Sequence, residues 1–502
     1  MKKPTAKLNT AAGLAWDRWV LALLLLGIIN QGSYFPGGIV SIVGVLAFCC
    51  IVKRVSLGVK HLPFLLFCGW FLFCSVQNGF VIEYAAMGLL PASAFLFYLL
   101  VTQTVADRQR FLRELVKGSA VIAVLAVTVT LFRSLGSLSL QRTAFPFGYA
   151  NSAGIFYGVM LLLTVKEKGA LKYLFAVTLL LTQSVGAILV TLLLLVVTDF
   201  KNKRNLVLLG LVILFGLCFK SRIAESVYTF VERLLQAYDG FWCMLKHPLF
   251  GIGVGRWEVL RPYFQSGVYT AKIIHSIPIQ IGVSSGVIGV LLFGVTVAQL
   301  LVSAFRQNRN GFWVALALVL HSLLDVTFAY GALAMLSACL VAEKEPPQKQ
   351  RIWDVAVFVA VLWLSAVLGL GIVQTQTLKN QVKAFSYPRA TTYYESTYLP
   401  RYSGAGQMEY LKALYAQGRY AEALTAMDEI NPKSDDHFLL SAWCGDADAL
   451  YQGLSAQPYN EKLYDELKAL DPDAAEQFWQ EGLKGLSPLG RILYYREGAK
   501  QE

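Results

Sequence analysis

The chain has 502 residues, of which 56% are hydrophobic and 15% charged, and its formal net charge is +12. With a mean hydropathy of +0.52, this composition is typical of a protein that crosses a membrane several times and excludes an ordinary soluble enzyme. The positive charge is not a nucleic-acid signature: residues 375–502 hold 13 basic and 18 acidic side chains, so the excess lies among the apolar segments.

Apolar segments recur through residues 1–374, and most approach the roughly 20 residues that a helix needs to cross the hydrocarbon of a bilayer. The pattern predicts an all-α transmembrane bundle of about twelve to thirteen spans. Two segments, 170–183 and 331–343, are short enough to be half-spans or tilted, packed helices. The predicted segments are 18–30, 36–52, 62–76, 84–102, 118–133, 149–165, 170–183, 185–199, 205–219, 275–304, 311–329, 331–343 and 352–374.

A long polar segment, residues 220–275, interrupts this pattern and is predicted to be a large extracytoplasmic loop. The side of the membrane on which this segment lies is predicted from Lys and Arg, which concentrate in the cytoplasmic segments of membrane proteins. If the N-terminus is cytoplasmic, the short outer turns hold only two basic residues, Arg133 and Arg142. The tail after residue 374 is then outside as well. Residues 1–374 therefore form the transmembrane domain of a multi-pass protein of the plasma membrane.

The tail divides into two parts by composition. Residues 375–402 are rich in Tyr, Thr and Pro and are predicted to be a linker, whereas residues 403–502 have a soluble, helical pattern. Residues 410–424 match one tetratricopeptide-like unit, a long helix, a glycine turn and a helix of small residues. Further helices are expected at 440–452, 459–470 and 473–484. The domain either caps the membrane part or binds a protein partner.

The eight cysteines give little functional information. Six lie in apolar segments, where cysteine behaves as a small hydrophobic residue. Cys243 and Cys444 are predicted outside and could form a disulfide. Because no Cys-x-x-Cys spacing and no nucleotide-binding fingerprint occur in the sequence, we expect neither a metal site nor a cofactor.

Arginines accompany aromatic residues and the glycine-rich run 248–255 in the large loop. The forked, permanently charged guanidinium group matches the oxygens of a phosphate. Arg222 and Arg233 are therefore candidates for binding an acidic lipid, with Arg256 as an accessory candidate. On a continuous helix the first two would share a face about 16 Å apart. The alternative is that these arginines only contact lipid headgroups.

His275, where the loop returns to the membrane, is the candidate general base, because its ordinary pKa of about 6.5 lets it accept a proton near neutral pH. The alternative is a structural role at a loop end. His321 and Asp325 are four residues apart in segment 311–329, so we expect them on one helix face, either lining a cavity or paired with each other. Asn151 is expected to cap a helix or bind its backbone.

Three stretches resemble the O-antigen ligase/polymerase superfamily of membrane glycosyltransferases. The first is Arg142-Thr-Ala-Phe-Pro-Phe-Gly-Tyr-Ala-Asn-Ser-Ala-Gly154. The second runs from Arg233 to Asp239 and on through Trp242, Pro248 and the glycines up to Gly255. The third is His275-Ser-Ile-Pro-Ile-Gln-Ile-Gly-Val-Ser-Ser-Gly-Val-Ile-Gly289. The chain departs from the family pattern at Ser276, Ser284 and Val185, where members often have Asn, Glu and Arg.

The resemblance implies a glycosyltransferase that acts on the outer face of the membrane without a metal. Its donor would be a glycan on an undecaprenyl-diphosphate-type lipid, and its acceptor a glycan or a lipid or wall component. Arg142, Arg222 and Arg233 would bind the diphosphate, and His275 would activate the acceptor. Ligation and polymerisation of repeat units both stay open. Two other classes are alternatives: a flippase of lipid-linked sugars, and a membrane-anchored scaffold that recruits partners through its tail.

Overall fold

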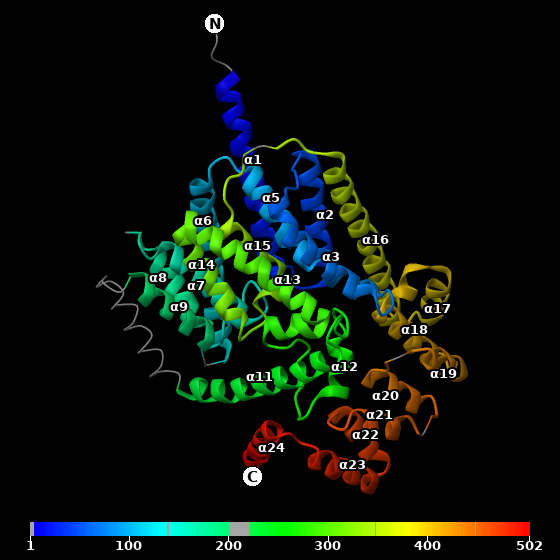
Figure 1. Cartoon of the computed structure of the whole chain (residues 1–502). Helices are drawn as coiled ribbons and strands as arrows, with labels where there is room; N and C mark the ends of the chain where they lie inside the picture. The colour runs from blue at the N-terminus through cyan, green and yellow to red at the C-terminus, as the bar shows by residue number, and fades with distance from the viewer. Residues whose placement is uncertain are drawn as a thin grey trace.

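The computed structural model describes residues 5–137, 140–167, 169–199, 220–346, 348–430, 432–446 and 448–501. All regular structure in these ranges is helical, as predicted, and no strand occurs in them. The predicted segment 205–219 lies outside the described residues. Figure 1 shows a bundle of steep helices, one long helix lying across its lower end, and a chain of short helices below and beside it.

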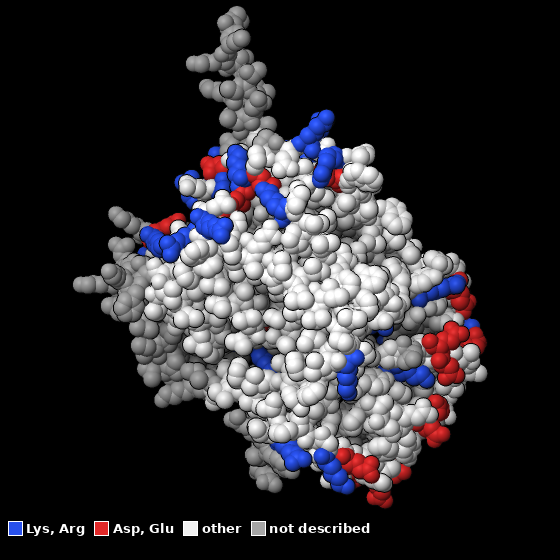
Figure 2. Space-filling view, in the orientation of Figure 1, with Lys and Arg blue, Asp and Glu red and all other residues white. Residues whose placement is uncertain are grey.

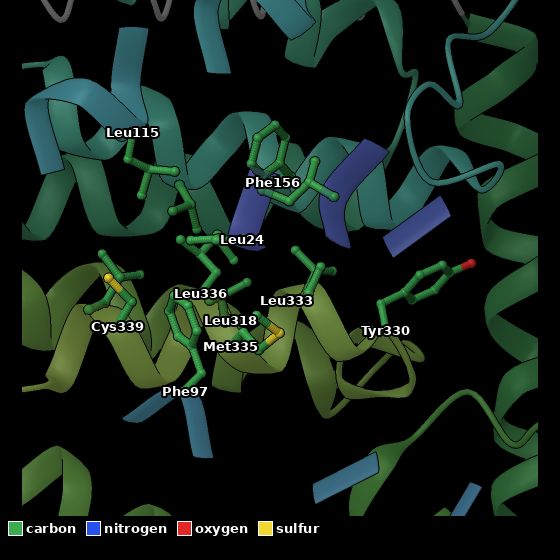
Figure 3. Close-up of a cluster of buried hydrophobic side chains, with 14 of the residues drawn as sticks. Leu24, Phe97, Leu115, Phe156, Leu318, Tyr330, Leu333, Met335, Leu336 and Cys339 are labelled. Carbon is green, nitrogen blue, oxygen red and sulfur yellow. The ribbon is translucent and has the colours of Figure 1, made fainter. Parts of the chain in front are cut away.

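A first group of helices lies around a large apolar core, to which helices of the second group also contribute. Its closest helix pairs are α2 with α16 and α5 with α15. Figure 3 shows part of this core, where Leu24, Phe97, Leu333 and Leu336 meet among buried neighbours. The helices of this first group are α1 (Thr5–Ile29), α2 (Pro36–Val52), α5 (Leu90–Thr104), α15 (Gly331–Val341) and α16 (Ile352–Lys383).

The second group packs closely through small residues on α7. A side chain at Gly158 would collide with Thr191 of α9, and one at Gly154 would meet Ser184, so glycine lets the two backbones approach. This is the physical role of the Ser-Ala-Gly154 stretch. The helices here are α6 (Arg108–Ser137), α7 (Ala150–Thr164), α8 (Leu171–Leu181), α9 (Val185–Asp199) and α14 (Arg309–Ser322).

The third group consists of α3 (Leu62–Val76), α4 (Ile82–Gly88) and α13 (Ile277–Gln307). Helix α13 is broken at Gly286, whose φ of +68° and ψ of −172° suit glycine. At the break the amide of Val287 donates to the carbonyl of Pro248, at 2.8 Å. The break in α13 therefore receives the glycine-rich run 248–255.

Five helices in the described part of the chain are long and apolar enough to cross a membrane: Val59–Val76, Ile82–Thr104, Arg108–Ser137, Ile277–Gln307 and Ile352–Lys383. Five others are apolar but shorter, and they include α8 and α15, the two segments expected to be short. The protein is thus a multi-pass membrane protein, and the count of twelve to thirteen full spans stays a prediction.

The segment 220–275 is not an open loop. It forms a 27-residue helix, α11 (Lys220–Lys246), and a short helix, α12 (Trp257–Phe264), followed by an irregular return to α13. Helix α11 lies across the end of the bundle (Figure 1). Positions 222 and 233 therefore lie on one continuous helix.

The tail corrects two expectations. The predicted linker 375–402 is largely helical, because α16 continues to Lys383 and α17 (Tyr387–Ser396) follows. The helix expected at 440–452 is split by a turn between α20 and α21. The tail helices are α18 (Gly404–Ala416), α19 (Tyr420–Asp428), α20 (Asp435–Trp443), α21 (Ala449–Ala456), α22 (Glu461–Leu470), α23 (Pro472–Lys484) and α24 (Pro488–Gln501).

The tail returns to the membrane domain through α24, which packs on α11. Leu493 is buried with Leu235 of α11, and the amide of Ser487 donates to the carbonyl of Ser266 at 3.0 Å. Cys243 and Cys444 are both free and buried, so the structure does not pair them.

Charge differs between the two ends of the molecule. In Figure 2, blue Lys and Arg side chains gather at the upper end, beside α1, and most of the red Asp and Glu side chains lie at the lower right over the tail. Helix α11 and the tail thus lie at the end opposite the basic one. That this end is extracytoplasmic stays a prediction.

Candidate functional site

Asp325 is the centre of a polar cluster beneath α11. Its buried carboxylate Oδ2 lies 3.0 Å from Nη2 of Arg233 and 2.7 Å from Nδ2 of Asn151, which donates to it. The hydroxyl of Tyr149 also donates to this oxygen, at 3.4 Å. A buried carboxylate requires such partners, because its desolvation is costly without them. Asp325 therefore brings α7 and α11 together in the turn after α14.

Helix α11 presents Arg233 to this cluster and leaves part of its guanidinium group available. Nη1 donates to the carbonyl of Leu324 at 2.8 Å, and Nη2 also donates to the hydroxyl of Tyr149 at 3.3 Å. Nε has no hydrogen-bond partner in the described part of the chain. The side chain is 21% exposed, so these contacts aim the guanidinium fork while it keeps access to the surface.

Arg142 reaches the same cluster from the segment before α7. Its Nε donates to the carbonyl of Thr182 at 3.1 Å, and its Nη2 donates to Oδ1 of Asn151 at 3.3 Å. Asn151 therefore connects Arg142 to Asp325 through its two amide atoms. The expectation that Asn151 caps a helix is wrong: α7 begins at Ala150 without a side-chain cap, and the amide is used by side chains.

His275 lies beside this cluster, with its ring centroid 6.3 Å from that of Tyr149. Its Nδ1 is 2.8 Å from Oε1 of Gln236, a buried residue of α11. The amide nitrogen of Gln236 donates to Glu232 at 2.9 Å, which orients the amide so that Oε1 faces the imidazole. Because an amide oxygen only accepts, Nδ1 carries the proton and Nε2 holds the free lone pair.

The environment of His275 favours its neutral form. Burial lowers the pKa of its imidazole below the ordinary value, the Asp325 carboxylate opposes this shift, and the Arg233 guanidinium adds to it. Two guanidinium groups and one carboxylate meet at Asn151 and Asp325, and the carboxylate of Glu232 lies at the other end of the Gln236 amide. The guanidinium groups of Arg142 and Arg233 can bind an anionic group, and Nε2 of His275 can accept a proton.

Hydrogen bonds to the side chains of Asp239 and Gln280 hold the segment that leads to His275. Asp239 of α11 accepts hydrogen bonds from Ser266, through its amide at 3.0 Å and its hydroxyl at 2.6 Å, and from the Tyr269 hydroxyl at 2.9 Å. Burial raises the pKa of Asp239, and these hydrogen bonds oppose the rise. Oε1 of Gln280 accepts from the amide of Ile274 at 2.9 Å. The segment before the histidine is thus tied to both α11 and α13.

The predicted relationship between His321 and Asp325 is wrong. Helix α14 ends at Ser322, so the two residues do not share a helix face. His321 is buried and its Nδ1 lies 2.7 Å from Oγ1 of Thr327, whereas Asp325 forms its ion pair with Arg233. Because α14 ends before Asp325, this residue lies in a turn, where its carboxylate contacts Arg233 of α11. His321 supports the fold of this turn from within the bundle.

Of the further predicted residues, Arg256 does not join the cluster. Arg256 bonds the carbonyl of Asn78 and lies over the ring of Tyr84, at the side of α3 and α4. It holds the glycine-rich run on that flank. The side chain of Arg222 lies outside the described side chains, although its backbone belongs to α11.

Sequence reasoning missed Tyr149 and Gln236. A signal for both was present: Tyr149 stands between Arg142 and Asn151 in the first family-like stretch, and Gln236 follows Arg233 by one helical turn. Among the described residues, no group of three or more His, Cys, Asp and Glu side chains could hold a metal ion.

Residues 170–294 match the family model described as O-antigen ligase. The match confirms the resemblance to the O-antigen ligase/polymerase superfamily over a segment that contains α11, the run 248–255 and His275. Arg142, Asn151 and Asp325 lie outside the matched residues, and the tertiary structure brings them to the site. No curated protein matches the chain.

Proposed function

We propose that the protein is a glycosyltransferase that moves a glycan from a polyprenyl diphosphate to an acceptor hydroxyl on the outer face of the plasma membrane. One observation carries the proposal: the family-like stretches meet in one cluster, where His275 offers a free Nε2 beside the guanidinium groups of Arg142 and Arg233. The donor would be of the undecaprenyl-diphosphate type, and the acceptor a glycan or a lipid or wall component.

The reaction needs two kinds of help. The acceptor oxygen forms a bond to the anomeric carbon of the donor, the bond between that carbon and the diphosphate oxygen breaks, and the acceptor proton moves to Nε2 of His275. A positioned base contributes roughly 10²–10⁴-fold in rate. The departing diphosphate gains charge, which Arg233 and Arg142 stabilise; one well-placed donor contributes about 2.7–4 kcal/mol. Arg222 is proposed to join them from the same helix.

The arrangement of partners suits these roles. Asp325 and Tyr149 orient Arg233 without consuming its whole fork, and Gln236 keeps the basic nitrogen of His275 turned away from α11. The reaction as written requires no metal ion, because guanidinium groups supply the positive charge that a divalent cation provides in many glycosyltransferases. We therefore expect transfer to continue in the presence of chelators.

Transfer of a labelled glycan from a synthetic polyprenyl-diphosphate donor, in proteoliposomes, tests the proposal. We expect His275→Ala to lower transfer by roughly 10²–10⁴-fold, the contribution of a positioned base. Arg233→Ala should abolish transfer, and Arg233→Lys should restore it only in part because lysine keeps the charge but loses the planar fork. His247→Ala and Arg133→Ala are matched controls, since both residues are exposed and lie outside the cluster.

Wild-type transfer by the His275 variant, or a requirement for Mg²⁺ or Mn²⁺, would contradict the mechanism. Movement of the lipid-linked sugar across the bilayer without a new glycosidic bond would instead support a flippase. A protein without the tail could keep full transfer activity but lose binding of a protein partner. That result would mean that the tail acts as a scaffold and takes no part in transfer.

A further inference from the structure

Helix α11 carries an apolar stripe on the side away from the candidate site. The stripe consists of residues that recur every three or four positions, as on one face of an α-helix, and each is 42–58% exposed. Polar side chains of the same helix, Arg233, Gln236 and Asp239, point the opposite way and are bound inside the protein. The stripe comprises Val227, Phe230, Leu234, Tyr238, Phe241, Trp242 and Leu245.

This arrangement is the reverse of a surface helix in water, which buries its apolar face and exposes its polar one. The tail does not cover the stripe. Helix α24 packs along one border of the stripe, through Tyr228, Val231 and Leu235, and leaves the seven stripe residues exposed. An apolar face of this length, left open on one long helix, indicates contact with another apolar phase or surface.

The stripe continues into the exposed flank of the candidate spans. Beyond α11 the exposed side chains of Leu249 and Phe250 extend it, and the ring of Phe250 stacks on Trp70 of α3, 5.4 Å between centroids. Leu291 and Val295, on the neighbouring span α13, are exposed as well. Outward apolar residues of a span face lipid, so lipid is the phase that the stripe adjoins.

Residue chemistry agrees with a position at the membrane surface. Tyr238 and Trp242 pair edge to face, with ring centroids 6.2 Å apart, and these two residue types are enriched where hydrocarbon meets headgroups. Lys246 ends the helix and is exposed, as expected for a cation that reaches the headgroup layer.

We infer that α11 is an interfacial helix whose stripe of seven apolar side chains is immersed in the acyl chains of the outer leaflet. Its axis then lies in the membrane surface, as amphipathic interfacial helices do. Arg233 and His275, on and beside the opposite face, are thereby held at the depth of the headgroups. The inference concerns the surface alone and holds whether or not the proposed transfer takes place.

Nitroxide labels on single cysteines at Leu234, Phe241 and Leu245 test it in vesicles of phosphatidylethanolamine and phosphatidylglycerol, with no glycan present. The full chain carries Cys218→Ser, because the other seven cysteines are buried. A label at the exposed tail residue Leu470 is the matched control. We expect collision with oxygen to exceed collision with a water-soluble nickel complex several-fold on α11, and the opposite order at Leu470.

Three results would overturn the inference. Greater access to the nickel complex at all three positions would mean that the stripe faces water. Dipolar broadening that disappears on dilution with unlabelled protein would mean that a second copy covers it. Low access to both reagents without broadening would mean that another part of the chain does so.

Discussion

At the scale of single residues, the lowered pKa of His275 has a measurable consequence. Burial lowers the pKa of the imidazole, and the base acts in its neutral form, so the rate of transfer should fall only when the pH drops through this lowered pKa. We expect the acid limb of kcat/KM to lie below pH ~6.5, the ordinary value for histidine. The residual activity of His275→Ala should lack that limb. An acid limb at or above pH 6.5 that belongs to His275 would contradict the environment described for it.

Gln236 tests positioning as distinct from chemistry. Replacing it with Leu removes the acceptor for Nδ1–H of His275, so either ring nitrogen can carry the proton and the ring can rotate. We expect kcat to fall about 10–100-fold, by analogy with the loss of the hydrogen-bond partner of a metal-bound histidine, with little change in KM for the donor. Gln236→Glu, which keeps the acceptor oxygen, should retain more activity than Gln236→Leu and raise the pKa of the acid limb. Equal loss in both variants would indicate a purely structural role.

At the scale of elements, the break in α13 depends on one glycine. Gly286 has φ +68°, and a side chain there would collide with the carbonyl of Leu249, so Gly286→Ala should destabilise the protein by more than about 1 kcal/mol. Gly294→Ala is the matched control in the same helix, because nothing lies within 4 Å of its side-chain position. Thermal unfolding in detergent should show a lower Tm for the first variant alone. Equal Tm values would mean that the break does not depend on glycine.

At the opposite end of the bundle, Glu345 holds three segments together. Its Oε1 lies 3.0 Å from both Lys60 and His61, and its Oε2 accepts from Gln103 at 3.5 Å. Burial alone raises the pKa of this carboxyl, but the hydrogen bonds from His61 and Lys60 outweigh burial and hold the pKa below the ordinary value.

A depressed folded-state pKa gives stability that is present above the unfolded value of about 4.3 and is lost as the pH falls through the folded value. At pH 7 the Tm of Glu345→Gln should therefore be lower than that of the wild type. In acid the difference between the two Tm values should become smaller, because the wild type has lost the contribution of the charged carboxylate. The Tm is measured in detergent across this range. A Tm difference that does not change with pH would show that the charge of Glu345 is not what stabilises the junction.

At the scale of the whole molecule, the tail has its own cores but also braces the site. Buried clusters around Leu414 and Leu463 lie wholly within residues 403–502, so this part expressed alone should be helical and melt cooperatively. A disordered product would mean that it folds only against the membrane domain.

The brace is tested separately. A side chain at Gly490 would meet the carbonyl of Ser266 and Gly267, so Gly490→Val should displace α24 from α11 and the segment before His275. We expect lower transfer and faster proteolysis in the full chain. Gly404→Val, at a position with nothing within 4 Å, is the control. Unchanged transfer by Gly490→Val would mean that the tail does not support the site and is an independent domain.

The linear sequence determined the helical class, the separate tail, and the candidates Arg142, Arg233 and His275. It could do so because hydrophobic periodicity, charge composition and short motifs are local properties. The tertiary structure alone decided that Asp325 pairs with a helix some ninety residues earlier, that Asn151 joins two side chains instead of capping α7, and that Arg256 stands apart. It also decided that α11 turns its polar face inward. A periodic apolar stripe predicts that something covers it, but which phase or segment does so depends on neighbours that are distant in the chain.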